Sequence, residues 1–432
     1  MHIWYIHHYA GGPGLGTHYR PYHLARAWQA QGHTAKIFMA GFHHLLETKQ
    51  DLAPSFEIDG AKYVTIPARR YVGNGVSRIL NMWDFSSGLR AAGLRLGESE
   101  ARPDAIVVSS PHPFSIFVAH SLARKYRAKL VFEIRDIWPL SLTEILGVSP
   151  SHPFVRLCGY AERFALNNAD MIASVLPRAD RYLADRGYGD KPFVWVPNGV
   201  DRRAITASEP LGEASRIALE QLGQWRREGR VTIVHAGSLG KPNAVDLLLE
   251  ALLVGQARGE ADRCGVLLVG KGDQMSALQQ FVHEKGLKSV HFSGQVAKGD
   301  VARLLEACDV AYAGVRPFDR LYQYGVSLNK FADYFSASLP TILPIAPCGD
   351  PVSESGGGVA RRMETPEEVW GGLYELIQLP AEERRMRGGL GRAYMAREYD
   401  YEAIGRRYVD AIARLPSVAL EREEPGTKSG RD

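Results

Sequence analysis

The stretch Tyr324-Gly-Val-Ser-Leu-Asn-Lys-Phe-Ala-Asp-Tyr-Phe-Ser-Ala-Ser-Leu-Pro-Thr-Ile342 contains the pattern that decides the fold. It follows an apolar run, Val310 to Val315, which predicts a buried strand. Ser327 is a favourable N-cap residue, the residues after it favour a helix, and Pro340 ends that helix before the next apolar run. The pattern therefore predicts a helix that begins just beyond the end of a strand, as in a βαβ unit.

The start of this predicted helix is suited to binding a phosphate. A helix N-terminus presents unpaired backbone N–H groups and about half a positive charge. Lys330 adds a full cation, and Asp333 lies one turn further along the same face, where it could accept hydrogen bonds from ribose hydroxyl groups. The segment predicts a nucleotide-diphosphate site at Ser327, Lys330 and Asp333, although an ordinary capped helix with a surface aspartate would show the same pattern.

This segment resembles the nucleotide-binding signature of the retaining glycosyltransferases of family 4, which have the GT-B fold. The resemblance lies in the order Gly-x-Ser-x-Asn-Lys-x-x-Asp-Tyr followed by small residues and Pro-x-Ile, and it adds Asn329 to the implied donor site. Most of that family has two glutamates eight positions apart. Asp333 matches the second, whereas Gly325 stands at the position of the first. This departure resembles a bacterial branch, the WbuB-like N-acetylfucosamine transferases of surface-polysaccharide assembly.

The length of 432 residues exceeds what one hydrophobic core usually holds and predicts two domains. A formal net charge of +4, without basic clusters interleaved with aromatic residues, gives no reason to expect a nucleic-acid partner. The four cysteines form no CxxC pair, which favours reduced thiols in the cytoplasm. No run reaches about 18 uninterrupted apolar residues, so we expect a cytoplasmic protein that is soluble or peripheral at the inner face of the membrane.

Short apolar runs alternate with helical periodicity along most of the chain, which is typical of βαβ units around parallel sheets. In the first half we predict strands at residues 3–6, 35–39, 105–109, 129–134, 171–174 and 193–196. In the second half we predict strands at residues 231–236, 266–269, 290–293, 310–315 and 341–344. The predicted fold class is α/β, with two doubly wound Rossmann-like domains that, in the GT-B fold implied by the resemblance, face each other across a cleft.

We place an acceptor-binding domain at residues 1–200 and a nucleotide-sugar-binding domain at residues 201–398. The division falls at the turn-rich segment Pro197-Asn-Gly-Val-Asp201, and the resembled family has an equivalent segment before its second domain. The resemblance also implies that a C-terminal helix, residues 399–416, crosses back to the first domain. Residues 417–432 have little apolar content and are predicted to be disordered.

Glycine-rich turns after predicted strands could let a diphosphate approach backbone N–H groups. The turn from Tyr9 to Gly16 does not keep the Gly-x-Gly-x-x-Gly register, which argues against a nicotinamide-dependent dehydrogenase. The resemblance to GT-B transferases instead implies that Gly14 and Gly16 face the donor diphosphate. The segment from Gly265 to Lys271 only superficially matches a Walker A motif, because its middle is a predicted strand.

The same resemblance assigns donor-site positions in the second half of the chain. Gly270 and Gly272 would lie beside the nucleotide base, and Gly237 would lie at the diphosphate. Lys241 follows the first strand of the second domain, where basic side chains bind the diphosphate in the resembled family. Lys241 is therefore the candidate cation for stabilising the leaving group, with a solvated loop lysine as the alternative.

The segment Glu133-Ile-Arg-Asp-Ile-Trp-Pro139 places three charged residues at the end of a predicted strand. Charges there are costly unless they are paired or used in function. One interpretation is an arginine–carboxylate pair that holds the strand to its loop. The other is acceptor positioning and hydroxyl polarisation by Glu133, Arg135 and Asp136, and the segment resembles the Glu-x-Arg-Asp-x-Trp-Pro signature of the same bacterial branch.

Two further patterns concern metals and membranes. Eight of the 14 histidines fall in the first 44 residues, but without a His-x3-His pair or an acidic partner they predict no metal site. The segment from Arg69 to Phe85 mixes arginines with large apolar residues, which suits contact with an anionic bilayer or a polyprenyl-diphosphate-linked acceptor. Packing of an amphipathic helix on the core is the alternative.

The residues and the resemblance together predict a metal-independent, retaining glycosyltransferase. It would transfer a sugar from a nucleotide diphosphate, expected to be UDP, to a glycan or lipid-linked acceptor in bacterial surface-polysaccharide assembly. Lys241, Lys330 and the helix start at Ser327 would stabilise charge on the leaving diphosphate. Two other functions stay open: a catalytically silent nucleotide-sugar-binding subunit, and a GT-B nucleotide-sugar epimerase.

Overall fold

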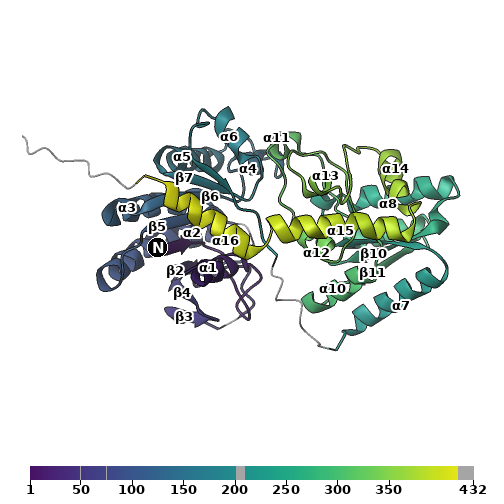
Figure 1. Ribbon diagram of the computed structural model, residues 1–432, viewed down its shortest axis with the longest axis horizontal. Helices are drawn as coiled ribbons and strands as arrows, with labels where there is room; N and C mark the ends of the chain where they lie inside the picture. The colour runs from purple at the N-terminus through teal and green to yellow at the C-terminus, as the bar shows by residue number, and fades with distance from the viewer. Residues whose placement is uncertain (49, 74, 201–209, 417–432) are drawn as a thin grey trace, which may run out of the picture. The chain divides into compact units, whose positions relative to one another are not determined.

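The computed structural model describes residues 1–48, 50–73, 75–200 and 210–416 (Figure 1). The predicted disordered tail, residues 417–432, and part of the predicted division between domains, residues 201–209, lie outside the described residues. Contacts divide the chain into two compact units. Unit 1 comprises Met1–Glu133, Tyr160–Ala173 and the chain from Arg407, and unit 2 comprises Ile134–Gly159 and Ser174–Arg406.

The first sheet has eight strands in the order β3-β4-β2-β1-β5-β6-β7-β8. The central pairs are parallel, and β3 pairs antiparallel with β4. The middle strands are buried along almost their whole length, as expected for a parallel sheet that is covered on both faces. The strands are β1 (His2–Ile6), β2 (Thr34–Ala40), β3 (Ser55–Ile58), β4 (Ala61–Ile66), β5 (Ala105–Ser109), β6 (Lys129–Ile134), β7 (Met171–Ser174) and β8 (Phe193–Trp195).

The helices that alternate with these strands bury one face each. In the first of them, α1, Leu24 and Trp28 are fully buried, and Pro21 occupies a position in the first turn where no backbone N–H is needed. The helical elements are α1 (Arg20–Ala30), α2 (Val76–Ser99), η1 (Pro113–Ser115), α3 (Ile116–Tyr126), α4 (Leu140–Glu144), α5 (Pro153–Asn168) and α6 (Ala179–Asp185).

The second sheet has six strands in the order β11-β10-β9-β12-β13-β14, and all their pairings are parallel. Its strands are β9 (Val231–Ala236), β10 (Cys264–Val269), β11 (Val290–Gly294), β12 (Val310–Tyr312), β13 (Thr341–Leu343) and β14 (Gly358–Ala360). The helical elements are α7 (Glu213–Arg227), η2 (Lys241–Asn243), α8 (Val245–Ala257), η3 (Ala261–Arg263), α9 (Met275–Glu284), α10 (Lys298–Glu306), α11 (Asp319–Tyr322), α12 (Lys330–Ser336), α13 (Pro351–Ser355), α14 (Pro366–Ile377), α15 (Ala381–Glu398) and α16 (Tyr401–Arg414).

Alternate residues of β10 enter two separate cores. Val266 and Leu268 pack in a cluster with Trp370 of α14, whereas Leu267 and Val269 pack in a cluster with Tyr334 of α12. Because side chains alternate along a strand, an apolar run of this kind supplies both faces of a sheet. Helices therefore cover both faces, which makes the second sheet doubly wound.

The last helix, α16, has its C-terminal part in unit 1 (Figure 1, yellow). The Tyr408 ring is fully buried and lies 5.5 Å from the Trp28 ring of α1. The Lys129 ammonium of β6 donates a hydrogen bond to the Ile412 carbonyl at 2.9 Å. The end of the described chain is thus part of the core of its first fold unit.

The α/β fold class of two Rossmann-like sheets predicted from the sequence is confirmed, but three strands were not predicted. The β3–β4 hairpin turns at Asp59 and Gly60, which have φ values of 45° and 87°. Asp-Gly between alternating apolar residues is the usual signal for such a turn, so the sequence contained the information. Strand β14 has three residues only, and β12 ends at Tyr312, three residues before its predicted end.

No helix among residues 1–48, 50–73, 75–200 and 210–416 is both long and apolar enough to cross a membrane.

Candidate functional site

The predicted N-cap of the helix in the opening stretch, Ser327, is wrong by two residues. Helix α12 begins at Lys330, and its N-cap position is taken by Asn329, whose side chain makes no capping bond. The side-chain oxygen of Asn329 instead accepts a hydrogen bond from Asn198 at 2.9 Å. Ser327 lies in the loop before the helix. The loop is therefore held by a long-range side-chain contact, which outweighs the local capping preference of serine.

Lys330 is the centre of a polar cluster formed by three loops of unit 2. Its ammonium donates to the side-chain oxygen of Asn243 at 2.8 Å and to the Gly314 carbonyl at 3.5 Å. A Cβ atom on Gly237 would lie 4.0 Å from Cε of Lys330 and 3.9 Å from Nε2 of His235. Lys330 therefore lies close to the loop that follows β9, to η2 and to the loop that follows β12.

The charge of Lys330 is held in unusual surroundings. Burial lowers its pKa from 10.5 to about 8. The adjacent His235 is fully buried, and burial together with the charge of Lys330 lowers the pKa of His235 to about 3, so this histidine is neutral. In the described part of the chain, Lys330 forms no ion pair with a carboxylate, and its hydrogen-bond partners are neutral oxygens. A poorly solvated cation without a counter-ion favours binding of an anion.

The other predicted donor-site side chains, Lys241 and Asp333, are exposed. Lys241 is the first residue of η2, on the same short element as Asn243, the partner of Lys330. Asp333 lies on α12, one turn after Lys330. Both side chains are accessible to a ligand, and their assignment to the donor site stays a prediction.

The glycines at 270 and 272 have a structural explanation of their own. A Cβ atom at Gly270 would lie 1.9 Å from the Gly237 carbonyl oxygen, and one at Gly272 would lie 2.4 Å from the Leu239 carbonyl. Backbone hydrogen bonds join the same two loops, from Gly237 N to the Val269 carbonyl at 2.9 Å and from Leu239 N to the Lys271 carbonyl at 3.0 Å. Close contact between the loops after β9 and β10 therefore requires glycine, whether or not a nucleotide base binds beside them.

In unit 1, the two glycines assigned to the diphosphate have different surroundings. A Cβ atom at Gly16 would lie 2.5 Å from the Leu45 carbonyl oxygen, so this glycine allows packing between loops. Gly14 is exposed, with φ of 71°, and nothing lies within 4 Å of the position its Cβ would take. Of the two, Gly14 is the one that a ligand could approach.

Glu133 lies at the end of β6, is completely buried, and forms an ion pair. Arg20 of α1 contacts its carboxylate at 2.9 Å, and the hydroxyls of Tyr5 and Ser109 each donate to it at 2.8 Å. The pairing interpretation of this segment therefore describes Glu133 well, and Arg20 of α1 is a partner. A carboxylate so enclosed is not accessible to an acceptor, and this geometry disfavours a catalytic role for Glu133.

Arg135 and Asp136 follow the last residue of β6, Ile134, in the turn that leads to α4. Asp136 is exposed and Arg135 is half-buried. Both therefore remain suitable for contact with a substrate, unlike Glu133.

A histidine cluster at the strand ends of unit 1 was missed as a site. His8 follows β1 and His112 follows β5, and their ring nitrogens lie 2.6 Å apart. The other ring nitrogen of His8 lies 2.8 Å from the side-chain oxygen of Asn81. Burial lowers the pKa of His112 to about 3 and that of His43 to about 4, so these two rings are neutral at pH 7. Their positions directly after predicted strands were the available signal.

In the sequence, these histidines were assessed only as metal ligands, and no metal site was predicted. Within the described ranges, no group of three or more His, Cys, Asp or Glu side chains is arranged to hold a metal ion.

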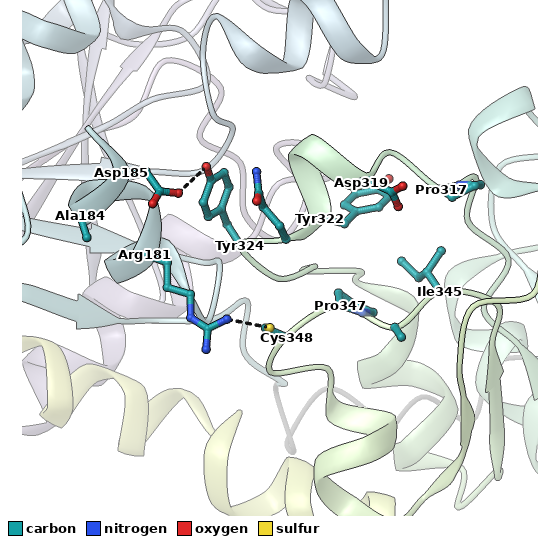
Figure 2. A pocket seen from close by; sticks show the side chains of 12 residues that line it. Arg181, Ala184, Asp185, Pro317, Asp319, Tyr322, Tyr324, Ile345, Pro347 and Cys348 are labelled. Carbon is teal, nitrogen blue, oxygen red and sulfur yellow. Dashed lines mark hydrogen bonds between the residues drawn. The ribbon is translucent and has the colours of Figure 1, made fainter. Parts of the chain in front are cut away.

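The first residues of the opening stretch border an open pocket of about 550 Å³ in unit 2 (Figure 2). The Tyr324 hydroxyl donates to Asp185 at 2.9 Å, and Arg181 donates to the Cys348 sulfur at 3.1 Å. The Arg178 N–H donates to the Tyr324 carbonyl at 3.1 Å. The chain is thus fixed against α6 just before Gly325.

Gly325 occupies a position where no other residue fits without strain. Its φ is 98°, and a Cβ atom there would lie 2.5 Å from the ring of Pro177. The carboxylate that the resembled family has at this position is therefore excluded by backbone conformation and by packing.

The two doubly wound sheets and the strand-end cluster around Lys330 define the class of protein, a GT-B fold. Residues 16–199 match the family model described as "Glycosyl transferase 4-like domain", and residues 230–367 match the one described as "Glycosyl transferases group 1". The chain therefore has the two domains of a GT-B glycosyltransferase.

Solved structures show the same fold over nearly the whole chain. Sucrose-phosphate synthase from Thermosynechococcus elongatus is similar, with 15% identity, a TM-score of 0.70, and coverage of 96% of this chain and 99% of that chain. HepE from Anabaena, in complex with UDP-glucose, has 14% identity, a TM-score of 0.61, and coverage of 96% and 100%. WaaG, a glycosyltransferase of lipopolysaccharide biosynthesis, has 14% identity, a TM-score of 0.61, and coverage of 95% and 100%. No curated protein shows significant sequence similarity to the chain.

Proposed function

We propose that the protein is a retaining glycosyltransferase that transfers a sugar from a UDP-sugar to a glycan or lipid-linked acceptor in bacterial surface-polysaccharide assembly. The observation that carries this proposal is Lys330, a half-buried cation whose partners are neutral oxygens of Asn243 in η2 and of Gly314 after β12. A diphosphate would supply the missing counter-charge. The HepE complex with UDP-glucose and the role of WaaG in lipopolysaccharide biosynthesis support the donor and the pathway class.

Electrostatic stabilisation of the leaving group would supply most of the catalysis. As the bond between the sugar and the diphosphate breaks, negative charge develops on the departing diphosphate. Lys330 would stabilise that charge more than the charge of the intact donor, and Lys241 would add a mobile cation from the adjacent η2. We propose that these two cations carry out the charge neutralisation without a divalent metal ion.

We propose that Arg135 and Asp136 position the acceptor hydroxyl. Both follow the C-terminal end of a central parallel strand, the edge where ligands bind in open α/β sheets. Asp136 is accessible and could accept the hydroxyl proton, while Arg135 could hold an anionic part of the acceptor.

The geometry of Gly325 bears on the silent-subunit alternative. The loss of the family's carboxylate at position 325 would favour a catalytically silent subunit if the glycine there had no structural explanation. The close approach of Pro177 instead explains the glycine by packing, so its presence is no sign of a decayed site.

Donor binding and turnover in the purified protein test the proposal. Thermal-shift measurements with UDP-, GDP- and ADP-sugars should show stabilisation by one class, about 2.7 kcal/mol at a hundredfold excess over the dissociation constant. Lys330→Met should abolish the thermal shift. It should also abolish turnover of the donor, measured as the slow release of UDP. Lys285→Met, an exposed lysine of the same unit, serves as the matched control and should change neither. A wild-type protein that binds no nucleotide sugar would exclude the proposed function.

A further inference from the structure

The N-terminal half of α2 has an apolar surface that none of the described residues covers. Val76, Ile79, Leu80 and Trp83 are 72%, 43%, 39% and 72% exposed, and Val72 in the preceding loop is 95% exposed. The four helical residues follow the spacing i, i+3, i+4, i+7 and therefore lie on one face. We call these five residues the α2 patch.

This patch is additional to the face that α2 contributes to the core. Met82, Phe85 and Leu89 are buried on the other side of the same helix. Five of the twelve large apolar side chains that are exposed in the described chain belong to the patch. Single exposed apolar residues are common, whereas a contiguous group that includes a tryptophan marks an interaction surface.

The charge around the patch indicates which partner it suits. Residues 69–95 contain five arginines and one aspartate, a net charge of +4 that equals the formal net charge of the whole chain. Arg69 is paired with Asp84 and Arg70 with Asp51, while Arg90 and Arg95 are exposed further along the helix. In a two-fold contact between copies of the chain, these like charges would be brought together. An anionic surface complements them.

A groove adjoins the patch on the same helix. It is open, has a volume of about 790 Å³, and runs between α2 and the segment that follows β4. Arg95 and the paired Arg69 and Asp84 line it together with small residues such as Ser87 and Ala91. Apolar side chains beside an arginine-lined groove provide separate contacts for the acyl chains and the phosphate groups of lipids.

We propose that the α2 patch docks on the surface of an anionic lipid bilayer. Trp83, Ile79 and Val76 would enter the boundary between head groups and acyl chains, and the flanking arginines would contact lipid phosphates. Binding of this kind does not depend on sugar transfer, so it can be tested separately from the proposed function.

Vesicle flotation tests the apolar contribution. The wild-type protein should float with phosphatidylcholine vesicles that contain about 30% phosphatidylglycerol, and less with pure phosphatidylcholine. The variant Val76→Ser/Ile79→Ser/Trp83→Ser should bind at least about tenfold more weakly, because its apolar contact is lost. The matched control is Met386→Ser/Leu390→Ser on α15, where both residues are also exposed, and it should bind like the wild type.

Arg90→Ser and Arg95→Ser test the charge contribution. Each should weaken binding to the anionic vesicles by roughly fivefold and leave binding to neutral vesicles unchanged. Brominated lipids should quench the fluorescence of the wild type more than that of Trp83→Phe, which places the tryptophan in the bilayer even if the triple variant folds poorly.

Three outcomes would overturn the proposal. The first is a wild-type protein that does not float with anionic vesicles. The second is a folded triple variant that binds as tightly as the wild type. The third is a change from dimer to monomer in the triple variant, measured by light scattering, which would assign the patch to contact between copies of the chain.

Discussion

At the residue scale, Lys330 combines a charge with surroundings that disfavour it. Sequence reasoning identified this lysine as a phosphate ligand, but placed it beside an exposed helix tip. In the structure its ammonium is held by Asn243 and Gly314, which come from loops 87 and 16 residues away in the sequence. Its lowered pKa results from burial by these loops, which no local pattern predicts.

Donor affinity should depend on the protonation of Lys330. Its pKa is about 8 in the folded protein, whereas the usual pKa of a lysine, as in the unfolded chain, is 10.5. The folded protein therefore loses this proton first as pH rises. A donor that needs the charged form should bind with constant affinity below about pH 8 and progressively more weakly above it. Calorimetric titration with UDP-glucose between about pH 6 and pH 9 measures this change in affinity. UDP-glucose is suitable because its diphosphate does not titrate in that range.

Lys330→Met should bind the donor weakly at every pH, and its donor affinity should no longer depend on pH. The opposite sign applies to stability without ligand: between the two pKa values the unfolded chain binds more protons, so stability should rise with pH. A wild-type affinity that stays constant through pH 9 would contradict the assignment of Lys330.

Position 325 makes a separate prediction about the missing carboxylate. Gly325→Glu restores the residue type of the resembled family, but it should destabilise unit 2 by about 2 kcal/mol or more, because of the positive φ and the contact with Pro177. Chemical denaturation measures the change. Gly325→Ala should show most of the loss, whereas Gly371→Ala, a helical glycine with open space at its Cβ, should be neutral or stabilising. Full stability of Gly325→Glu would refute the packing explanation.

At the element scale, the parallel strands followed their sequence patterns closely. The predicted ranges 105–109, 129–134, 171–174 and 231–236 match β5, β6, β7 and β9 at both ends. Long apolar runs bounded by turn residues define such strands well, because both faces are buried. The start of α12 was not predictable in the same way, since Asn198, distant in the sequence, competes for the N-cap side chain of that helix.

Helix α16 should be required for the stability of unit 1. In the part of α16 that belongs to unit 1, Tyr408 and Ile412 are fully buried, and Tyr408 packs against Trp28. Deletion of residues 407–432 should therefore lower the melting temperature of unit 1 by many degrees, since burial of each such side chain contributes about 1.5–3 kcal/mol. Differential scanning calorimetry measures this change in melting temperature.

Deletion of residues 417–432 alone is the control for this experiment. The sequence predicts that segment to be disordered, so its removal should leave the transition unchanged. A stable unit 1 without α16 would show that the helix is dispensable.

At the scale of the whole molecule, the two units should respond differently to the donor. The cluster of Lys330, Asn243 and Gly237 lies entirely in unit 2, and the loops around it are joined by backbone hydrogen bonds. Hydrogen exchange with and without UDP-glucose should show its strongest protection at residues 236–243 and 326–333. Protection confined to residues 1–133 would contradict the assignment of donor binding to unit 2.

The sequence by itself determined the α/β class, two sheets and the strand-end loops that supply the candidate site, because these follow from hydrophobic periodicity and turn residues. It also identified Lys330 as a cation for a phosphate and Glu133 as a charge in a costly position. Only the tertiary structure decided their roles: Glu133 is neutralised by Arg20 from another element, whereas Lys330 is left among neutral oxygens. The physical reason is that the cost of a buried charge depends on partners brought together by folding, and those partners are distant in the sequence.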